Sequence, residues 1–478
     1  MPVLNAPSRP RTITLPPRTA SIGGRASVLV VGGGPAGMGA ALGAAWAGAD
    51  VILAERYAFL GGNATVALVM PLMSFFTERR LPGKADNARL LPTDHGPGDP
   101  VVAGALATLL ERLVAASGAV PPSDETGYVV PFDPEMFKLV AAELLDEAGV
   151  NVLLHAFASG VLMEREHPGV IFETKSGPIL LEADVLVDCT GDGDIAAAAG
   201  APYEIGRDVD GLVQPMTLMF RMVGVDQAAF AAYVHENPSQ WRGVHGLWDL
   251  IAEAAAAGEL DLPREDILFF ATPHAGEVSV NSTRVTGVLG MNVWHLTYAE
   301  WLSRRQMRQI GAFLRKRVPG FPDSYIVQSG TQIGVRETRR ILGEYVLTAD
   351  DILSARKFED AIARGTYPID IHNPAGKGTL LKRVPLGEAY EIPLRCLVPK
   401  GSDRVLVAGR CISGTHEAHS SYRVTPTAMA TGQAAGICAA IAAGKRRRPR
   451  DVPAAEVQTE LRRQGASLRT PAGVQSAD

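Results

Sequence analysis

Apolar and polar positions along residues 1–203 form short alternating blocks. Runs rich in Val, Ile and Leu that are bounded by Gly, Pro or Asp indicate buried strands, and the longer blocks between them have helical spacing. The pattern predicts strands at 27–31, 50–55, 150–155, 170–174, 179–181 and 185–188, a turn at 176–178, and helices at 35–48, 105–117 and 134–149. The first strand, helix and second strand form a βαβ unit. The polar, proline-rich stretch 78–100 is expected to be loop.

The pattern changes after residue 204. Strand-like runs at 216–222 and 277–284 and helix-like runs at 248–257 and 297–318 follow without regular alternation. Such a mixture is typical of an inserted α+β domain. A buried strand returns at 404–408, followed by a small-residue helix at 426–443. We therefore predict an α/β fold with five segments: an extended lead-in (1–26), a Rossmann-type domain (27–204 and 395–445), an interleaved α+β substrate or cap domain (205–394) and a C-terminal tail (446–478).

Length and charge narrow the classes of protein to consider. With 478 residues the chain is too long for one compact core, and 46% hydrophobic with 20% charged residues is a globular composition. A net charge of −5 favours neither a nucleic-acid nor a membrane-surface partner. No apolar run approaches a membrane span, and the N-terminus lacks the apolar centre of a signal peptide. We expect a soluble cytoplasmic protein with a small-molecule substrate, and self-association into a homo-oligomer is left open.

The four cysteines, Cys189, Cys396, Cys411 and Cys438, are too far apart in sequence for a CxxC motif. They are interpreted as small buried side chains, which argues against a redox-active disulfide. The HxxH spacing of His416 and His419 lacks a third ligand, so we expect no metal site.

The most informative motif is Gly32-Gly-Gly34-Pro35-Ala36-Gly37, which fits GxGxxG and connects the first strand to the first helix. In such a unit Gly32 makes the sharp turn, Gly34 lets the backbone approach a pyrophosphate, and Gly37 lets the helix pack against the strand. The N-terminus of the helix supplies free amides and positive dipole. These features predict a dinucleotide site.

An acidic residue, Glu55, ends the second strand 18 residues after Gly37. A carboxylate at this place accepts hydrogen bonds from both hydroxyls of an adenosine ribose. Directly behind it lies the second glycine-bearing loop, Phe59-Leu-Gly-Gly-Asn-Ala-Thr65. In a simple NAD dehydrogenase the βαβ pattern would continue regularly here, so this loop favours an extended FAD.

Several further segments complete a resemblance to a known family. They are Asp188-Cys-Thr-Gly-Asp-Gly-Asp194, Gly334-Val-Arg-Glu-Thr-Arg-Arg340, Arg404-Val-Leu-Val-Ala-Gly-Arg-Cys411 and the stretch from His419 to Gly436. Together with the motifs above, the chain from about residue 13 to 443 resembles bacterial FAD-dependent oxidoreductases related to the fumarate reductase and glutathione reductase flavoprotein folds.

The resemblance implies FAD as cofactor and gives local roles to matching segments. The turn after Asp188 is expected near the flavin, the loop at Gly409 near the ribityl chain and pyrophosphate, and the N-terminus of the last helix at the pyrimidine edge of the flavin, with Thr425 as its cap and Pro426 in its first turn. The residues expected to contact FAD are Gly32, Gly34, Pro35, Ala36, Gly37, Glu55, Arg56, Gly61, Gly62, Asn63, Ala64, Thr65, Phe157, Ala158, Thr190, Gly191, Asp192, Gly409, Arg410, Arg423, Thr427, Ala428 and Met429.

Candidates for substrate chemistry come from the later part of the chain. Arg336 and Arg339 are candidates for clamping a substrate carboxylate, because arginine binds carboxylates in a fork geometry. Salt bridges with Glu337, Glu344 or Asp350 are the alternative for Arg336, and they are the favoured interpretation for Arg340.

Two histidines are candidates for moving a proton. His372 lies in a proline-bounded loop, where Asp370 is placed to orient it, and His416 precedes the last helix. Surface or hydrogen-bonding roles are equally consistent with a loop histidine.

The leading hypothesis is an FAD-dependent oxidoreductase that transfers a hydride between FAD and a small organic substrate, with a carboxylate as one candidate. One alternative is a flavoprotein that uses reduced FAD for a non-redox hydration, isomerisation or elimination. Another is an NAD-binding dehydrogenase without flavin. A pyridine-nucleotide disulfide reductase is disfavoured, because the chain has no second GxGxxG unit and no cysteine pair.

Overall fold

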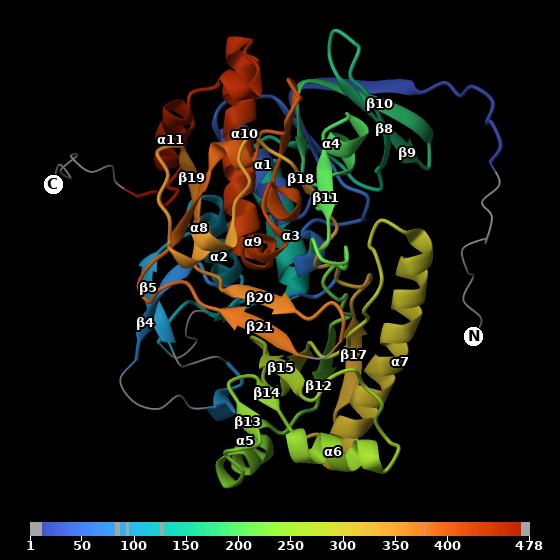
Figure 1. The fold of residues 1–478 in the computed structure, drawn as a ribbon, viewed down its shortest axis with the longest axis vertical. Helices are drawn as coiled ribbons and strands as arrows, with labels where there is room; N and C mark the ends of the chain where they lie inside the picture. Colours follow the sequence, from blue (N-terminus) through green and yellow to red (C-terminus); the bar gives the residue numbers. More distant parts are fainter. Residues whose placement is uncertain (1–11, 82–86, 92–94, 125–128, 377, 470–478) are drawn as a thin grey trace, which may run out of the picture.

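The computed structural model describes residues 12–81, 87–91, 95–124, 129–376 and 378–469. It consists of a larger α/β part and a smaller α+β part. In Figure 1 the larger part is drawn above the smaller one. The predicted α/β class with an interleaved second part is confirmed.

A seven-stranded sheet with the order β7-β2-β1-β10-β9-β8 organises the larger part, and β23 also pairs with β10. The strands β7, β2, β1, β10 and β23 run parallel, whereas β9 is antiparallel to β10 and β8. Their bounds are β1 Ser21–Val31, β2 Val51–Ala54, β7 Asn151–Leu153, β8 Phe157–Leu162, β9 Gly169–Thr174, β10 Gly177–Asp188 and β23 Val405–Val407.

Two helices of this part pack unusually closely. Helix α1 (Pro35–Trp46) begins directly after β1, and α10 (Thr425–Lys445) lies against it in the main core. A Cβ added at Gly436 would lie 1.9 Å from the carbonyl oxygen of Ala40, and one added at Gly39 would lie 2.2 Å from that of Met429. Glycine therefore sets the spacing of the helices whose N-termini meet at the functional site.

The remaining helices and hairpins of the larger part surround this core. The helices are α2 Ala105–Ala115, α3 Pro134–Glu147, α4 Asp194–Ala198, α8 Ala349–Leu353, α9 His416–Tyr422 and α11 Ala454–Arg463. The strand pairs are β3 Pro71–Met73 with β6 Val129–Pro131, β4 Phe76–Arg80 with β5 His95–Pro100, β11 Tyr203–Ile205 with β18 Arg339–Ile341, β19 Ala361–Gly365 with β22 Tyr390–Pro393, and β20 Ile369–His372 with β21 Thr379–Lys382. Short 3-10 turns lie at Gly62–Ala64, Asn87–Arg89, Leu394–Cys396, Gly409–Cys411 and Pro449–Asp451.

The smaller part has its own six-stranded sheet and its own core. The sheet order is β13-β14-β15-β16-β12-β17. Aromatic side chains fill its centre, with Phe230 edge-on to Trp241 at 5.1 Å between ring centroids. Its elements are β12 Phe220–Val223, β13 Trp241–Arg242, β14 His245–Gly246, β15 Ile267–Ala271, β16 Glu277–Val280, β17 Tyr325–Ser329, α5 Gln227–Glu236, α6 Trp248–Ala256 and α7 Val293–Arg317.

The structure differs from the predicted segments at several places. Strand β1 begins at Ser21, inside the predicted lead-in, because β10 extends far enough to pair with it there. Part of the predicted loop 78–100 pairs as β4 and β5, and the rest includes 82–86 and 92–94, which lie outside the described residues. The predicted tail contains α11, whose Val457 and Leu461 are buried in the main core. Within the predicted cap range, Ile341 and Ile392 also belong to that core.

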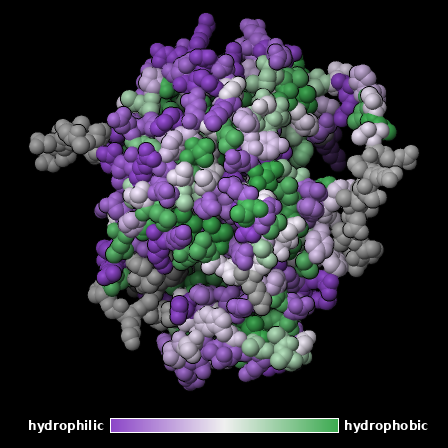
Figure 2. All heavy atoms as spheres, viewed as in Figure 1, coloured by the Kyte–Doolittle hydropathy of each residue, from purple (hydrophilic) through white to green (hydrophobic). Residues whose placement is uncertain are grey.

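Helix α10 is long and apolar enough, by length and composition, to cross a membrane. The sequence alone predicted no apolar run of that length. However, 78% of its most apolar window is buried inside the protein, as in a core helix of a soluble protein. On the face shown in Figure 2, hydrophobic side chains lie scattered among hydrophilic ones.

Candidate active site

A cleft of about 1200 Å³, its open mouth included, lies at the carboxyl ends of the parallel strands β1, β2 and β10. This edge of an open α/β sheet is where ligands bind in such folds. Many of the residues predicted to contact a cofactor line it: Gly32, Gly34, Pro35, Ala36, Glu55, Arg56, Gly62, Asn63, Phe157, Ala158, Thr190, Gly191, Asp192, Gly409, Arg410, Arg423 and Ala428. The others do not line the cleft: Gly37, Gly61, Ala64, Thr65, Thr427 and Met429.

Two glycine loops meet at the floor of the cleft. A Cβ added at Gly62, where φ is +48°, would lie 2.8 Å from the Cα of Gly34. Gly37 is required for packing, because its Cβ would lie 1.7 Å from the carbonyl oxygen of Gly32. Helix α1 starts at Pro35 without a side-chain cap, so its first amides remain available to an anion.

Glu55 is buried at the end of β2 and shapes the same loop. One carboxylate oxygen accepts the Gly33 amide at 2.5 Å, and the other accepts the Tyr57 amide at 2.9 Å. Because each carboxylate oxygen has two lone pairs, both retain capacity for a ribose hydroxyl.

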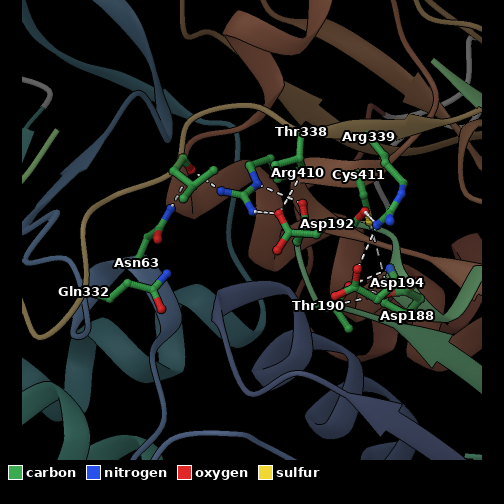
Figure 3. Close-up of polar contacts among 12 residues, drawn as sticks. Asn63, Asp188, Thr190, Asp192, Asp194, Gln332, Thr338, Arg339, Arg410 and Cys411 are labelled. Atoms are coloured by element: carbon green, nitrogen blue, oxygen red, sulfur yellow. Dashed lines mark hydrogen bonds and ion pairs between the residues drawn. The ribbon is translucent and has the colours of Figure 1, made fainter. Parts of the chain in front are cut away.

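Asp188 holds the turn that follows β10. Its carboxylate accepts the backbone amides of Thr190 at 3.0 Å, Ile195 at 2.8 Å and Ala196 at 2.9 Å. Burial raises the pKa of this fully buried carboxyl to about 6, although these hydrogen bonds act in the opposite direction. Asp188 therefore anchors the turn Thr190–Asp192, whose three residues line the cleft. Figure 3 shows Asp188 beside Thr190.

The segment 332–338 crosses the cleft and is bonded to both of its sides. Arg410 donates to the carbonyl oxygens of Gly191, at 2.8 Å, and of Val335, and to the carboxylate of Asp192 at 2.5 Å (Figure 3). Asn63 donates to the same Val335 carbonyl at 3.2 Å. The guanidinium of Arg410, predicted to meet the cofactor, is thus largely engaged by the protein.

Sequence reasoning missed several residues of the cleft. Tyr57 and Gln332, whose side chains contact each other, lie in it together with Asp194, Gly290, Leu296, Val335 and Thr425. Most come from the segments 290–296 and 332–335, which no nucleotide motif marks. The adjacency of Tyr57 to Glu55 was the one available signal.

The donor groups in the cleft fit FAD. The N-terminus of α10 has no side-chain cap, and Thr425 and Ala428 of its first turn line the cleft. The prediction that Thr425 caps this helix was wrong: Val424 occupies the cap position and Thr425 is already helical. Two uncapped helix N-termini, of α1 and α10, thus open into one cleft beside a buried ribose-binding carboxylate. This is the donor set that a pyrophosphate and an electron-rich flavin ring require.

Arg336 does not itself line the cleft, although the preceding residue, Val335, does. Its Nη1 donates to the carbonyl oxygen of Pro215 at 2.7 Å and to the hydroxyl of Thr217 at 2.6 Å. Burial, and then the positive charge of Arg423, lower the pKa of Arg336 to about 9. Neither Glu337 nor the other carboxylates considered in the sequence forms a salt bridge with it.

His372 ends β20, with its Nε2 3.5 Å from the carboxylate of Asp370 and its Nδ1 3.4 Å from the hydroxyl of Thr379. Burial and the neighbouring Arg336 lower the pKa of His372 to about 4, so the imidazole is neutral at neutral pH. Burial acts to raise the pKa of Asp370, but the charge that His372 acquires on protonation and the charge of Arg423 hold it below its ordinary value. This carboxyl is therefore ionised.

The other two catalytic candidates are engaged elsewhere. Arg339 is paired with Asp194 at 2.7 Å and donates to the carbonyl oxygen of Asp192. His416 is bonded through Nδ1 to the fully buried Glu337 at 2.9 Å. Arg340 pairs with Glu337 at 2.7 Å, as predicted.

All four cysteines are free and buried, which confirms their predicted placement. In the part of the chain that the structure describes, no group of three or more His, Cys, Asp or Glu side chains is placed to hold a metal ion.

A model of the family described as FAD dependent oxidoreductase matches residues 27–461. The chain belongs to this family. It is an FAD-dependent oxidoreductase, and its cofactor is FAD. No curated protein matches the sequence. Similar solved structures include a geranylgeranyl bacteriochlorophyll reductase-like protein from Thermoplasma acidophilum, with 14% identity, 92% of this chain and 83% of that chain covered, and a TM-score of 0.45. An anhydrotetracycline hydroxylase from Streptomyces rimosus has 12% identity, coverage of 92% and 66%, and a TM-score of 0.44. At these values neither carries an argument about substrate.

Proposed function

We propose that this flavoenzyme oxidises or reduces a small organic acid, whose carboxylate is held by Arg336 and Arg423. The observation that supports this most is that a partly buried arginine, Arg336, acts through its charge on a second arginine, Arg423, at the cleft. Arg423 lines the cleft beside the N-terminus of α10, and Arg336 lies close enough for the two charges to influence each other. Like charges that are held together away from water are costly unless anions join them. Asp370, 3.8 Å from Arg423, supplies one negative charge, which leaves one positive charge for a substrate carboxylate.

FAD, when bound, supplies the site that accepts or donates the hydride, and the protein orients the substrate and handles the proton. Arg336 is prepared for this role, because Nη1 is fixed by Pro215 and Thr217 while the rest of its guanidinium has no hydrogen bond with the described residues. A guanidinium presents parallel donors that match a carboxylate.

His372 is the proposed proton carrier. As a neutral imidazole it accepts a proton at Nε2 when the substrate is oxidised and returns it when the substrate is reduced. The 3.5 Å separation from Asp370 is long for a hydrogen bond, so Nε2 remains available, while the ionised Asp370 stabilises the imidazolium that forms.

The test is anaerobic mixing of the FAD-loaded protein with 2-hydroxy, 2-amino and saturated carboxylic acids and with the corresponding amides. Bleaching of the oxidised flavin absorbance by acids but not by their amides supports the proposal. Reoxidation of the chemically reduced protein by 2-oxo or unsaturated acids tests the opposite direction. Product formation without consumption of an electron acceptor would instead support the non-redox alternative.

Arg336→Met is expected to abolish the response to acids while FAD remains bound. Arg336→Lys retains the charge without the fork and should restore it in part. The matched control is Arg308→Met, which removes an exposed arginine of α7 that does not line the cleft. Equal flavin reduction by acids and amides in the wild type would contradict the proposal.

A further inference from the structure

The side chains around Arg336 carry more positive charge than one substrate carboxylate would neutralise. Arg284, from the smaller part, reaches the β20–β21 hairpin beside His372: it contacts Gly378, and the next residue, Thr379, lies 3.4 Å from Nδ1 of His372. The charges of Arg264 and Arg284 also act on Arg336 and lower its pKa. Arg284 is 5% exposed and donates through Nη2 to the carbonyl oxygen of Gly378, in the turn of the β20–β21 hairpin, at 3.0 Å. In Figure 1 this hairpin lies between α9 and the strands of the smaller sheet. The cations therefore reach the site from both sides of the hairpin.

The charges of this cluster do not balance. In the part of the chain that the structure describes, the ion pairs of Arg264, Arg284, Arg336 and Arg423 involve two carboxylates: Asp266, 3.0 Å from Arg264, and Asp370, 3.8 Å from Arg423. His372 is neutral at neutral pH. Two positive charges remain in excess, and Asp266 is shared with a further partner, His245, at 2.9 Å.

Hydrogen-bond donors are also in excess. Gln214 is 1% exposed, and its Nε2 has no acceptor among the described residues, nor has Nε of Arg423. The two side chains are neighbours, since Oε1 of Gln214 lies 3.5 Å from Nη2 of Arg423. The backbone amide of Gln214 is fixed by Glu337 at 3.0 Å, which limits where this side chain can go. A buried donor without an acceptor is costly, so these groups are arranged for an acceptor that a ligand supplies.

We propose that the substrate is a small organic dianion, with one anionic group on Arg336, Arg423 and Gln214 and the second on Arg284. This inference rests on the proposed function and specifies its substrate class. Gln214 acts as a specificity residue, because its amide N–H can donate to the first anionic group beside the two guanidinium groups. The second group is a carboxylate or a phosphate-like oxyanion, which arginine binds with the same fork.

The choice of probe distinguishes the two candidates for the second anionic group, a carboxylate and a phosphate-like oxyanion. The probes are straight-chain α,ω-dicarboxylates of increasing length, the half-amide of each, and 3-phosphonopropionate. Binding to the FAD-loaded protein is measured by isothermal titration calorimetry, which needs no turnover. At least one dianion is expected to bind about 10- to 100-fold more tightly than its half-amide, the range for one added charged hydrogen bond. Tightest binding by a dicarboxylate or by the phosphonate identifies the second group, and either outcome supports the proposal.

Variants assign the two ends of the site. Arg284→Met should weaken dianion binding much more than half-amide binding, so that the two affinities converge, whereas Gln214→Leu should weaken both by a similar factor. Arg308→Met, which changes net charge equally, should weaken neither. The comparison of dianions with their half-amides uses the wild-type protein, so it tests the proposal even if a variant fails to fold. Equal affinity of the wild type for dianions and half-amides would overturn this proposal while leaving the proposed function intact. If no acid of either kind binds or reduces the flavin, the proposed function fails as well.

Discussion

The contact between α1 and α10 gives the most quantitative test of the fold. In Gly436→Ala the new methyl group would lie 1.9 Å from the carbonyl oxygen of Ala40 and 2.9 Å from its Cα. The obstacle is backbone of the neighbouring helix, so no rotamer change relieves it and the helices must separate by more than 1 Å. Overpacking of this kind costs about 3 kcal/mol, and replacing glycine by alanine inside a helix returns about 1 kcal/mol. We expect a net loss of about 2 kcal/mol in the free energy of unfolding.

The matched control is Gly444→Ala in the same helix. Gly444 is exposed, and a Cβ there would meet nothing within 4 Å. Here only the helix propensity changes, so the free energy of unfolding should rise by about 0.5–1 kcal/mol. Both are measured by urea denaturation of the apoprotein, followed by the fluorescence of its five tryptophans. The two variants should shift the midpoint in opposite directions. If Gly436→Ala stabilised the protein as Gly444→Ala does, the close helix contact would be refuted.

Three further predictions concern titratable groups near the site. Arg336→Met removes a like charge and should raise the pKa of His372 from about 4, as observed by histidine NMR; an unchanged or lower pKa would show that the two do not interact. Because His372 titrates below its ordinary value in the fold, its contribution to stability is present above about pH 6.5 and is lost as pH falls towards 4. His372→Gln should flatten the pH dependence of the denaturation midpoint in that window, and an unaltered curve would count against the shift. Asp188→Ala leaves the buried amides of Ile195 and Ala196 unpaired, at about 1–3 kcal/mol each, and should lower the FAD content of the purified protein; full FAD occupancy would argue against the anchoring role of Asp188.

The nucleotide half of the site could be predicted from the sequence because its requirements are local. The GxGxxG turn, the strand before it and the acid at Glu55 each follow from a few adjacent residues. The same locality made the parallel strands and α1 predictable. The ends of elements were less predictable: β1 begins at Ser21 because a partner strand distant in sequence pairs with it.

The substrate half depends on contacts that no local pattern encodes. Arg336 and Arg339 stand in one short motif, yet one lies in the cation cluster and the other is paired with Asp194. Their separation follows from the course of the backbone around β18. The same holds for Gln214 and Arg284. The amide of Gln214 and the guanidinium of Arg284 become neighbours of the site only because the chain folds around the β20–β21 hairpin.

The measurement that tests the central claim most directly is the absorbance spectrum of the purified protein before and after acid precipitation. The account predicts a flavin spectrum that moves into the supernatant and is identified by chromatography as FAD, with one FAD per chain, since the two helix N-termini and Glu55 form a single cleft. A colourless protein that cannot be reconstituted with FAD would contradict the account.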